Sequence, residues 1–183
     1  MPPPRFQPTL KEKRKAFRRC FDASTLLLSF LIYRNHVYPL VERVHGADSQ
    51  QHTAMNYANA IATMLALRQL HEFFLPSENR RDIRALHFGY IRHRPLLAND
   101  EKQKIDQTLI HLSFEAFRFR NTPRNLARYM RKAIIRYLAF VKHCERRVFS
   151  KDANTSAEIE KIQRGFAHQL ALIKAYEGAE TGP

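Results

Sequence analysis

Apolar residues recur every three or four positions along most of this chain, which is the spacing of one face of an α-helix. Glycine and proline, the residues that most often interrupt regular structure, number only 5 and 9 among 183 residues. Long segments therefore run without a break, and the pattern predicts an all-α fold. The length suits one domain, so the expected architecture is a single compact bundle of about five to seven helices.

Caps and helix breakers give approximate limits for the helices. The expected segments are about 9–44, 48–75, 80–88, 100–119, 122–148 and 155–178. Capping-box patterns begin three of them, at 48–51, 100–103 and 155–158. Asp22 and Ser24 offer an N-cap in the middle of the first segment, so that segment is expected to form either one helix or two.

Domain organisation follows from the same signals. Residues 1–8 include four prolines, which disfavour a helix, and are expected to form a flexible N-terminal arm. Residues 9–177 form the predicted bundle domain, with Gly46 and Pro76 ending its first two segments. Residues 178–183 are expected to be a flexible C-terminal tail.

The segment 122–148 has the most regular pattern in the chain. Its apolar face consists of Leu126, Tyr129, Met130, Ala133, Ile134, Tyr137, Leu138 and Val141. A similar inward face on the last segment consists of Ile159, Ile162, Phe166 and Ile173. A basic flank on the first of these helices consists of Arg124, Arg128 and Arg131, with Lys132 and Arg136 beside them. Such a flank is either a solvated surface or a contact for phosphate.

The charge of the chain favours a polyanionic partner. Lysine and arginine number 31 against 17 acidic residues, which gives a formal charge of +14 and a pI near 10.2. A field of this size attracts nucleic acid, with an anionic membrane or an acidic protein as the alternatives. Arg92 and Arg94 lie beside His93, Phe88 and Tyr90, a combination that suits phosphate contact and base stacking but is equally typical of a solvated loop.

Several classes of site are disfavoured. Cys20 and Cys144 are too few and too distant in sequence for a zinc site, and neither a glycine-rich phosphate loop nor an HExxH motif is present. We therefore expect no metal and no cofactor. No segment approaches the ~20 apolar residues of a membrane span, so no membrane-spanning helix is expected and no membrane is counted among the favoured partners. The two isolated cysteines suit a reducing cytoplasm.

One predicted helix carries an unusual polar stripe. Lys104, Thr108, His111, Glu115 and Arg118 are spaced three or four residues apart, so they share one face. The neighbouring apolar face consists of Ile105, Leu109, Leu112 and Ala116. The stripe is either a polar functional site or an ordinary solvated face.

A charged pair also occurs on the predicted helix before it. Arg68 and Glu72 fall on the same stripe as Ile61, Leu65 and Leu75, which is unusual for a face directed at a core. They form either a half-buried ion pair that ties this helix to a neighbour or the support of a catalytic site.

Three short segments, in order, resemble uncharacterised bacterial helical proteins related to the HEPN superfamily. They are Leu67-Arg-Gln-Leu-His-Glu-Phe-Phe74, Arg81-Asp-Ile-Arg-Ala-Leu-His-Phe88 and Ile105-Asp-Gln-Thr-Leu-Ile-His-Leu-Ser113. The resemblance covers about residues 56–141. It implies a small α-helical bundle, often dimeric, and for many members a metal-independent RNase activity in toxin–antitoxin, phage-defence or CRISPR systems.

The motif of the active HEPN members is an arginine followed, four to six residues further on, by a histidine. Here the matching histidine is His111, but the residue that six intervening residues separate from it is Lys104, so the motif reads Lys-x6-His. Lysine lacks the planar fork of a guanidinium. Arg136-x6-His143 satisfies the spacing literally. Because it lies on a regular basic helix, we interpret this match as chance and keep it as a reserve candidate.

These observations lead to three hypotheses. The first is an RNA-binding protein that cleaves RNA without metal, with His111 as general acid and base, Lys104 or Arg118 stabilising charge on phosphate, and Glu115 orienting the imidazole. RNA is favoured over DNA because its 2′-hydroxyl can act as the nucleophile. The second is a non-catalytic small basic subunit of a defence or CRISPR-type ribonucleoprotein. The third is a partner for an acidic protein, and a homodimer is compatible with all three.

Overall fold

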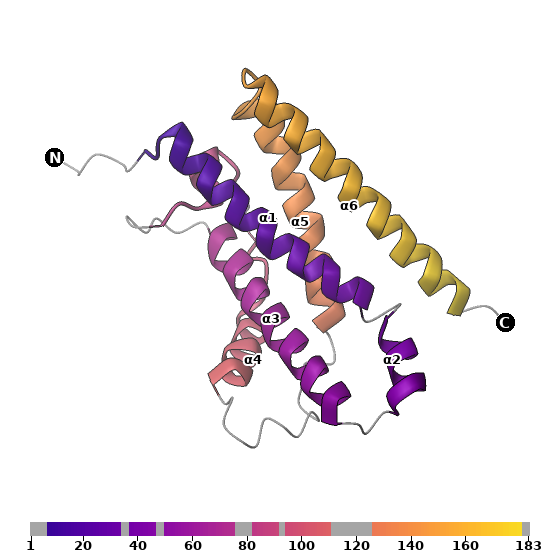
Figure 1. Ribbon diagram of the computed structural model, residues 1–183. Helices are drawn as coiled ribbons and strands as arrows, with labels where there is room; N and C mark the ends of the chain where they lie inside the picture. The colour runs from indigo at the N-terminus through magenta and orange to yellow at the C-terminus, as the bar shows by residue number, and fades with distance from the viewer. Residues whose placement is uncertain are drawn as a thin grey trace.

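The computed structural model describes residues 7–33, 37–46, 50–75, 82–91, 94–110 and 126–180. Its elements are α1 (Leu10–Ile32), α2 (Tyr38–His45), α3 (Gln50–Phe74), the 3-10 helix η2 (Ala85–Phe88), α4 (Asn99–Ile110), α5 (Leu126–Arg147) and α6 (Ala153–Glu180) (Figure 1). The described ranges contain no strand. The predicted all-α bundle is therefore confirmed, with six α-helices in the part of the chain that the structure describes.

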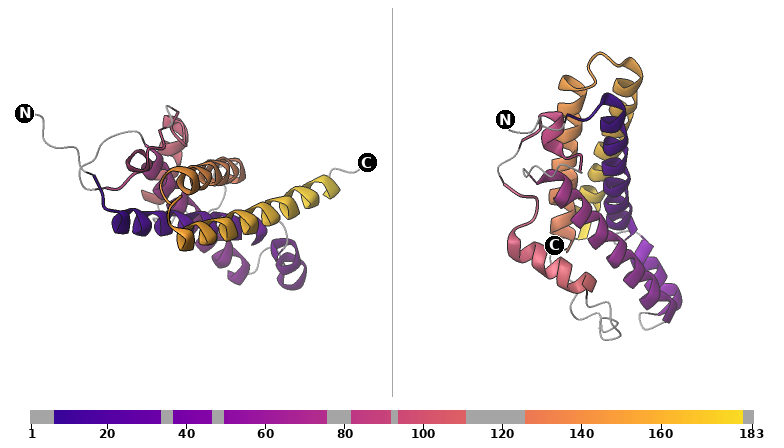
Figure 2. Two further views of the ribbon diagram at one scale, coloured as in Figure 1. Left: turned by 90° about the horizontal axis from the view of Figure 1, so that it is seen from above. Right: turned by 90° about the vertical axis from the view of Figure 1, so that its left-hand side faces the viewer.

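Helix α1 occupies the centre of the bundle. It packs against α3, α5 and α6, and it runs antiparallel to α3 and α5 (Figure 1). Helix α6 returns alongside α5 after a short turn, and α4 lies on the side of α3 that faces away from α1 (Figure 2). Helices α1, α3, α5 and α6 thus supply most of the main core, and η2 and α4 add buried residues to it.

The apolar face predicted for 122–148 is the main wall of this core. Met130, Ala133, Ile134, Tyr137 and Val141 are completely buried, as expected for residues spaced three and four apart. They meet the α1 and α3 residues Leu27, Leu28, Leu31, Leu67 and Leu70. The prediction for the last helix is confirmed for Ile159 and Phe166, which are buried against the same core.

Phe140 connects the elements of the core through a cluster of aromatic rings. Its ring centroid lies 5.1–6.0 Å from those of five others, which come from α1, α3, η2 and the residue after Gly89: Phe17, Phe73, Phe74, Phe88 and Tyr90. Four of these contacts are edge-to-face, the geometry that aromatic rings prefer. One side chain of α5 therefore holds three separate parts of the chain together.

Side chains from two helices bind backbone groups of the described residues between α3 and α4. The Leu97 N–H donates to Nδ1 of the buried His71 of α3 at 3.1 Å, and burial lowers the pKa of this histidine. From α5, Arg136 Nη1 donates to the Arg94 carbonyl at 2.8 Å. His143 Nε2, also of α5, lies 2.9 Å from the Phe88 carbonyl. The next residue, Gly89, has a φ of +74°, a backbone conformation that favours glycine.

The first predicted segment does not divide into two helices at Asp22 and Ser24. Helix α1 continues through both residues, because Ser24 is fully buried in a face that includes Leu27 and Leu28. The chain leaves α1 after Ile32, and α2 begins beside Pro39, whose fixed φ suits a first helical turn. Gly46 ends α2 as predicted.

Two further expectations about helices are wrong. Within the expected helix 80–88, the described residues 82–84 are not helical and only Ala85–Phe88 forms a 3-10 turn. On α3, the stripe that contains Leu65 and Arg68 is not the core face, since both side chains are about half exposed. The core face is one position away, at Ala60, Met64, Leu67, His71 and Phe74.

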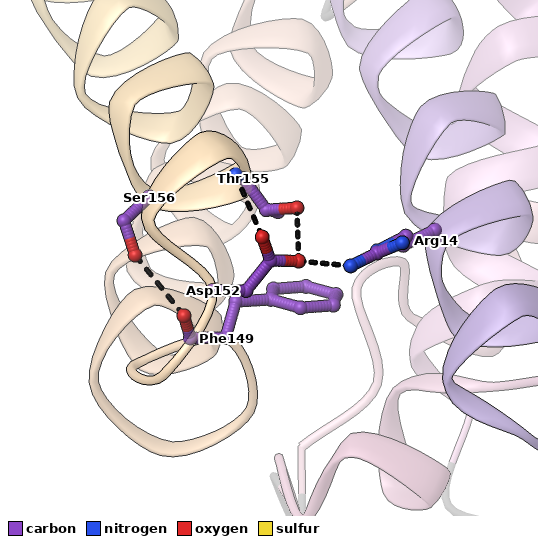
Figure 3. Close-up of polar contacts among 5 residues, drawn as sticks. All are labelled: Arg14, Phe149, Asp152, Thr155 and Ser156. Atoms are coloured by element: carbon purple, nitrogen blue, oxygen red, sulfur yellow. Dashed lines mark hydrogen bonds and ion pairs between the residues drawn. The ribbon is translucent and has the colours of Figure 1, made fainter.

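The caps of α4 and α6 lie two and three residues before the predicted boxes. At α4, Glu101 accepts the Ala98 N–H at 2.7 Å, where the sequence pattern favoured Asp100 and Gln103. At α6, the cap is Asp152, which accepts from the Thr155 N–H at 3.3 Å and from the Thr155 hydroxyl at 2.6 Å (Figure 3). Helix α6 then extends to Glu180, three residues into the expected tail.

The Asp152 carboxylate also ties the start of α6 to α1. Arg14 reaches across from α1 and pairs with Asp152, so one carboxylate serves a helix cap and an interhelical ion pair (Figure 3). The Thr155 hydroxyl and then Arg14 lower the pKa of Asp152 below its ordinary value of 3.8. The Ser156 hydroxyl completes the turn by donating to the Phe149 carbonyl at 3.0 Å.

Replacing Phe140 by alanine should lower the free energy of unfolding by about 3–5 kcal/mol, because it removes a ring from a packed cluster and leaves a cavity. Chemical denaturation followed by circular dichroism measures the change. The control is Ile135→Ala on the same helix, whose side chain is 64% exposed and whose loss should change the free energy by about 0.5 kcal/mol or less. Equal effects of the two substitutions would contradict the role of the cluster.

The Asp152→Asn variant should be less stable than the wild type at neutral pH, since asparagine can cap α6 but cannot pair with Arg14. A depressed pKa means that the carboxylate contributes stability above its unfolded value and that this contribution is lost as pH falls through the folded value. The difference in urea midpoint should therefore shrink on acidification. When both proteins also carry Arg14→Gln, the difference between them at neutral pH should be smaller. A difference that changes neither with pH nor with the Arg14→Gln substitution would contradict the assignment.

Candidate nucleic-acid interface

The side of α5 that faces away from the core carries a stripe of exposed cations. Positions 128, 132, 135, 139, 142 and 146 follow one another at intervals of four and three, so they form one stripe. We define the α5 basic face as the exposed residues Arg128, Arg131, Lys132, Lys142 and Arg146. Its ends are about 27 Å apart, at 1.5 Å per helical residue.

The basic face has two clusters of charge with an apolar centre. Arg128, Arg131 and Lys132 form the first cluster, and Lys142 and Arg146 the second, with the exposed side chain of Ile135 between them. Glu145 is the only acidic residue of α5. It accepts a hydrogen bond from Gln163 of α6 at 2.9 Å, and so lies on the side of α5 that faces another helix. The charged residues that α5 itself contributes to the exposed side are therefore all positive.

Some of the predicted phosphate-binding residues have structural partners. Lys132 Nζ lies 3.6 Å from Glu101, the residue that also caps α4, so part of its charge is balanced. Arg136 is half-buried and donates to the Arg94 carbonyl, which makes it a clamp on the segment before α4. Among the described residues, Arg128, Lys142 and Arg146 form no ion pair.

A shallow pocket of about 390 Å³ lies at the C-terminal end of the basic face. It is lined by Tyr90, Ala139, Lys142, His143, Arg146 and Arg147. The His143 ring meets Tyr90 edge-on, with centroids 5.5 Å apart, and its Nε2 faces the Phe88 carbonyl. When the neutral ring donates from Nε2 to that carbonyl, Nδ1 is left as a proton acceptor. The pocket thus places an imidazole of fixed orientation beside three cations.

The N-terminal half of α1 adds a second basic surface near this end of the bundle. Lys11, Lys15 and Arg18 share an exposed side of α1. Lys13 Nζ lies 5.9 Å from the centroid of Phe88, a cation–π arrangement, and Arg14 pairs with Asp152. The cations of α1 therefore divide between structural contacts and a solvated surface.

The predicted catalytic stripe falls mostly on residues that the structure leaves undescribed. His111, Glu115 and Arg118 lie in the stretch 111–125, between the described ends of α4 and α5. Lys104 is described: its side chain is 64% exposed and lies 3.9 Å from Asp100, one turn earlier. The neighbouring apolar residues Ile105 and Leu109 are buried, so the predicted orientation of this helix is confirmed over its described length.

Arg68 and Glu72 have separate surroundings. Arg68 Nε lies 3.5 Å from Asp106 of α4, which also pairs with Lys102, so the arginine does tie α3 to a neighbouring helix. Its partner, however, is Asp106 rather than Glu72. Glu72 instead lines a pocket between α1 and α3. The two residues predicted to act together therefore belong to different places in the fold.

Of the other predicted nucleic-acid contacts, Arg94 is exposed, and Arg92 and Arg124 lie outside the described ranges. The prediction omitted Lys142, Arg146 and Arg147. The signal for the first two was present, because they continue the four-and-three spacing that begins at Arg128. The contribution of Tyr90 to the pocket could not be read from the pattern, since it depends on where the segment after η2 meets α5.

The described residues contain no group of three or more histidine, cysteine or acidic side chains placed to hold a metal ion. Cys20 and Cys144 are free and buried, and burial raises the pKa of both thiols. In the same part of the chain, none of the helices is both long enough and apolar enough to cross a membrane. No family model, curated protein or solved structure matches the chain.

Proposed function

We propose that this protein binds nucleic acid, with RNA favoured, along the α5 basic face. The observation that carries the proposal is the distribution of charge on one rigid helix: five exposed cations on the outward side, and a single acid on the side of Gln163. Cations that neutralise phosphates release condensed counterions, which gives salt-sensitive binding with little dependence on sequence. The formal charge of +14 adds long-range attraction.

The rigidity of α5 supports the same proposal. Its apolar face is anchored in the core, so the cations project from a backbone that need not become ordered on binding. Ile135 and Ala139 lie between the charged clusters and can contact sugars or bases, while His143 and Tyr90 lie at the far end. In this proposal the protein acts as a basic subunit of a ribonucleoprotein, or alone.

Reversing two charges of the basic face, as Arg128→Glu with Arg146→Glu, should weaken binding of labelled RNA by at least about tenfold at moderate salt. It should also lower the slope of log K against log salt by about two, one for each lost phosphate contact. Fluorescence anisotropy over a salt series measures both quantities.

The matched control is Lys161→Glu with Arg164→Glu on α6, where both residues are exposed. It changes the net charge by the same amount at a different place and should have a much smaller effect. Equal loss with both pairs would show that binding follows net charge alone. No binding of RNA or DNA by the wild type would instead favour an acidic protein as the partner.

Metal-independent RNA cleavage is a second candidate function, and the pocket at His143 favours it. We propose that the His143 imidazole takes the proton of a 2′-hydroxyl as the oxygen attacks the adjacent phosphorus, while Lys142, Arg146 or Arg147 stabilises the added negative charge. The bond to the 5′-oxygen then breaks, that oxygen takes up a proton from water, and the imidazolium returns its proton to water. His111, with Lys104, is the other candidate, by resemblance to HEPN proteins.

Substitution of each histidine in turn shows whether His143 or His111 is responsible for cleavage. With EDTA present, wild-type protein should cleave labelled single-stranded RNA, and loss of the acting histidine should slow cleavage by about 10²–10⁴-fold. His143→Gln is the suitable variant, because its amide can still donate to the Phe88 carbonyl; His111→Ala is its counterpart. If wild-type protein binds the RNA but leaves it intact, the catalytic proposal is contradicted and the protein is a binding subunit.

A further inference from the structure

A second pocket lies on another part of the molecule, between α1, the C-terminal end of α3 and residues 82–84. Its volume is about 390 Å³, which is within the range of small-molecule sites. Ala16, Cys20 and Ala23 line it from α1, and Leu70 and Phe73 line it from α3. The pocket therefore has an apolar floor that is part of the main core.

The cations of this pocket come from both sides of it. Lys15 and Arg19 of α1 are exposed, one turn apart, and line it from one wall. Arg84, from the residues before η2, also lines it, and only 9% of its side chain is exposed. A guanidinium at the edge of a pocket is suited to an oxyanion, because its planar set of N–H donors matches the geometry of a phosphate.

The acidic residues around the pocket differ in what else they contact. Glu12 Oε2 accepts both the backbone N–H and the hydroxyl of Thr9, at 2.7 and 2.8 Å, as the cap of α1. Asp82 is 61% exposed and lies 3.9 Å from Arg84. Glu72 and the neighbouring Gln69 face the pocket from α3. The wall of α3 thus presents a hydrogen-bond acceptor across from the cations of α1.

We propose that this pocket binds a nucleoside monophosphate. The phosphate would contact Arg84, Arg19 and Lys15, and the base would lie on the apolar floor formed by Phe73, Leu70 and Ala16. Glu72 would accept a hydrogen bond from an exocyclic amino group, which adenine and cytosine have and uracil lacks. The proposal goes beyond the α5 basic face, because the two sites share no residue. The nucleotide is either free or the phosphorylated end of an RNA.

Isothermal titration of the full-length protein with AMP, CMP, UMP, adenosine and inorganic phosphate tests the ligand class. AMP and CMP should bind at least about tenfold more tightly than adenosine or phosphate alone, since only the nucleotide reaches both the floor and the cations. UMP should bind more weakly than CMP, and Glu72→Gln should narrow that difference. Failure of AMP to bind folded wild-type protein would overturn the proposal.

Neighbouring residues of α1 provide a matched pair of variants. Arg19→Gln should weaken AMP binding by about five- to tenfold, whereas Arg18→Gln, which removes the same charge outside the pocket, should leave it unchanged. Ala16→Leu should abolish binding by filling the floor, with circular dichroism showing that the helices persist. Equal losses with Arg18→Gln and Arg19→Gln would show non-specific attraction and overturn the proposal.

Two further experiments distinguish a free nucleotide from an RNA end, and this pocket from the α5 basic face. A 5′-phosphorylated tetranucleotide that displaces AMP, when its unphosphorylated counterpart does not, would identify an RNA end as the ligand. Lack of displacement would identify a free nucleotide. The Arg128→Glu, Arg146→Glu variant should bind AMP as the wild type does, even if it has lost RNA; loss of AMP binding in that variant would overturn the assignment to this pocket.

Discussion

The packing of Phe140 is the constraint on which the rest of this structure depends. Its ring is completely buried and contacts aromatic residues of α1, α3 and the segment that follows η2. Such contacts are possible only when the apolar face of α5 is directed into the bundle. Because a helix has two sides, that orientation also determines which residues of α5 meet solvent. Burial of the core therefore positions the α5 basic face, without any contact among the cations themselves.

Polar contacts at the edge of the core have a different role. His71, Arg136 and His143 each pair with a backbone group of the described residues between α3 and α4. These bonds satisfy backbone groups that would otherwise be costly to bury, and they set the position of Tyr90 and of the start of α4. A histidine and an arginine with the spacing of an RNase motif thus have structural partners, and His143 retains a ring nitrogen for chemistry when its other nitrogen donates.

The two proposed sites use the positive charge of the chain in different ways. On α5, exposed cations on a rigid face suit a long polyanion, whose phosphates need no enclosed pocket. Between α1 and α3, a buried guanidinium and an apolar floor suit one small anion with an apolar body. Two other cations of α1, Arg14 with Asp152 and Lys13 with Phe88, hold α1 against neighbouring parts of the chain. Net charge alone therefore does not identify a binding surface.

The sequence by itself determined the all-α class, the inward face of α5 and the end of α2 at Gly46, because these follow from spacing and from local backbone preference. It also indicated Arg128, Arg131 and Lys132 as one surface. Only the tertiary structure decided that Arg68 pairs with Asp106 rather than Glu72, that Asp152 caps α6 while holding Arg14, and that Arg136 clamps a carbonyl. The pocket between α1 and α3 belongs to the same group. Each of these joins residues far apart in the chain, and periodicity along one helix carries no information about the side chains that a neighbouring helix will supply.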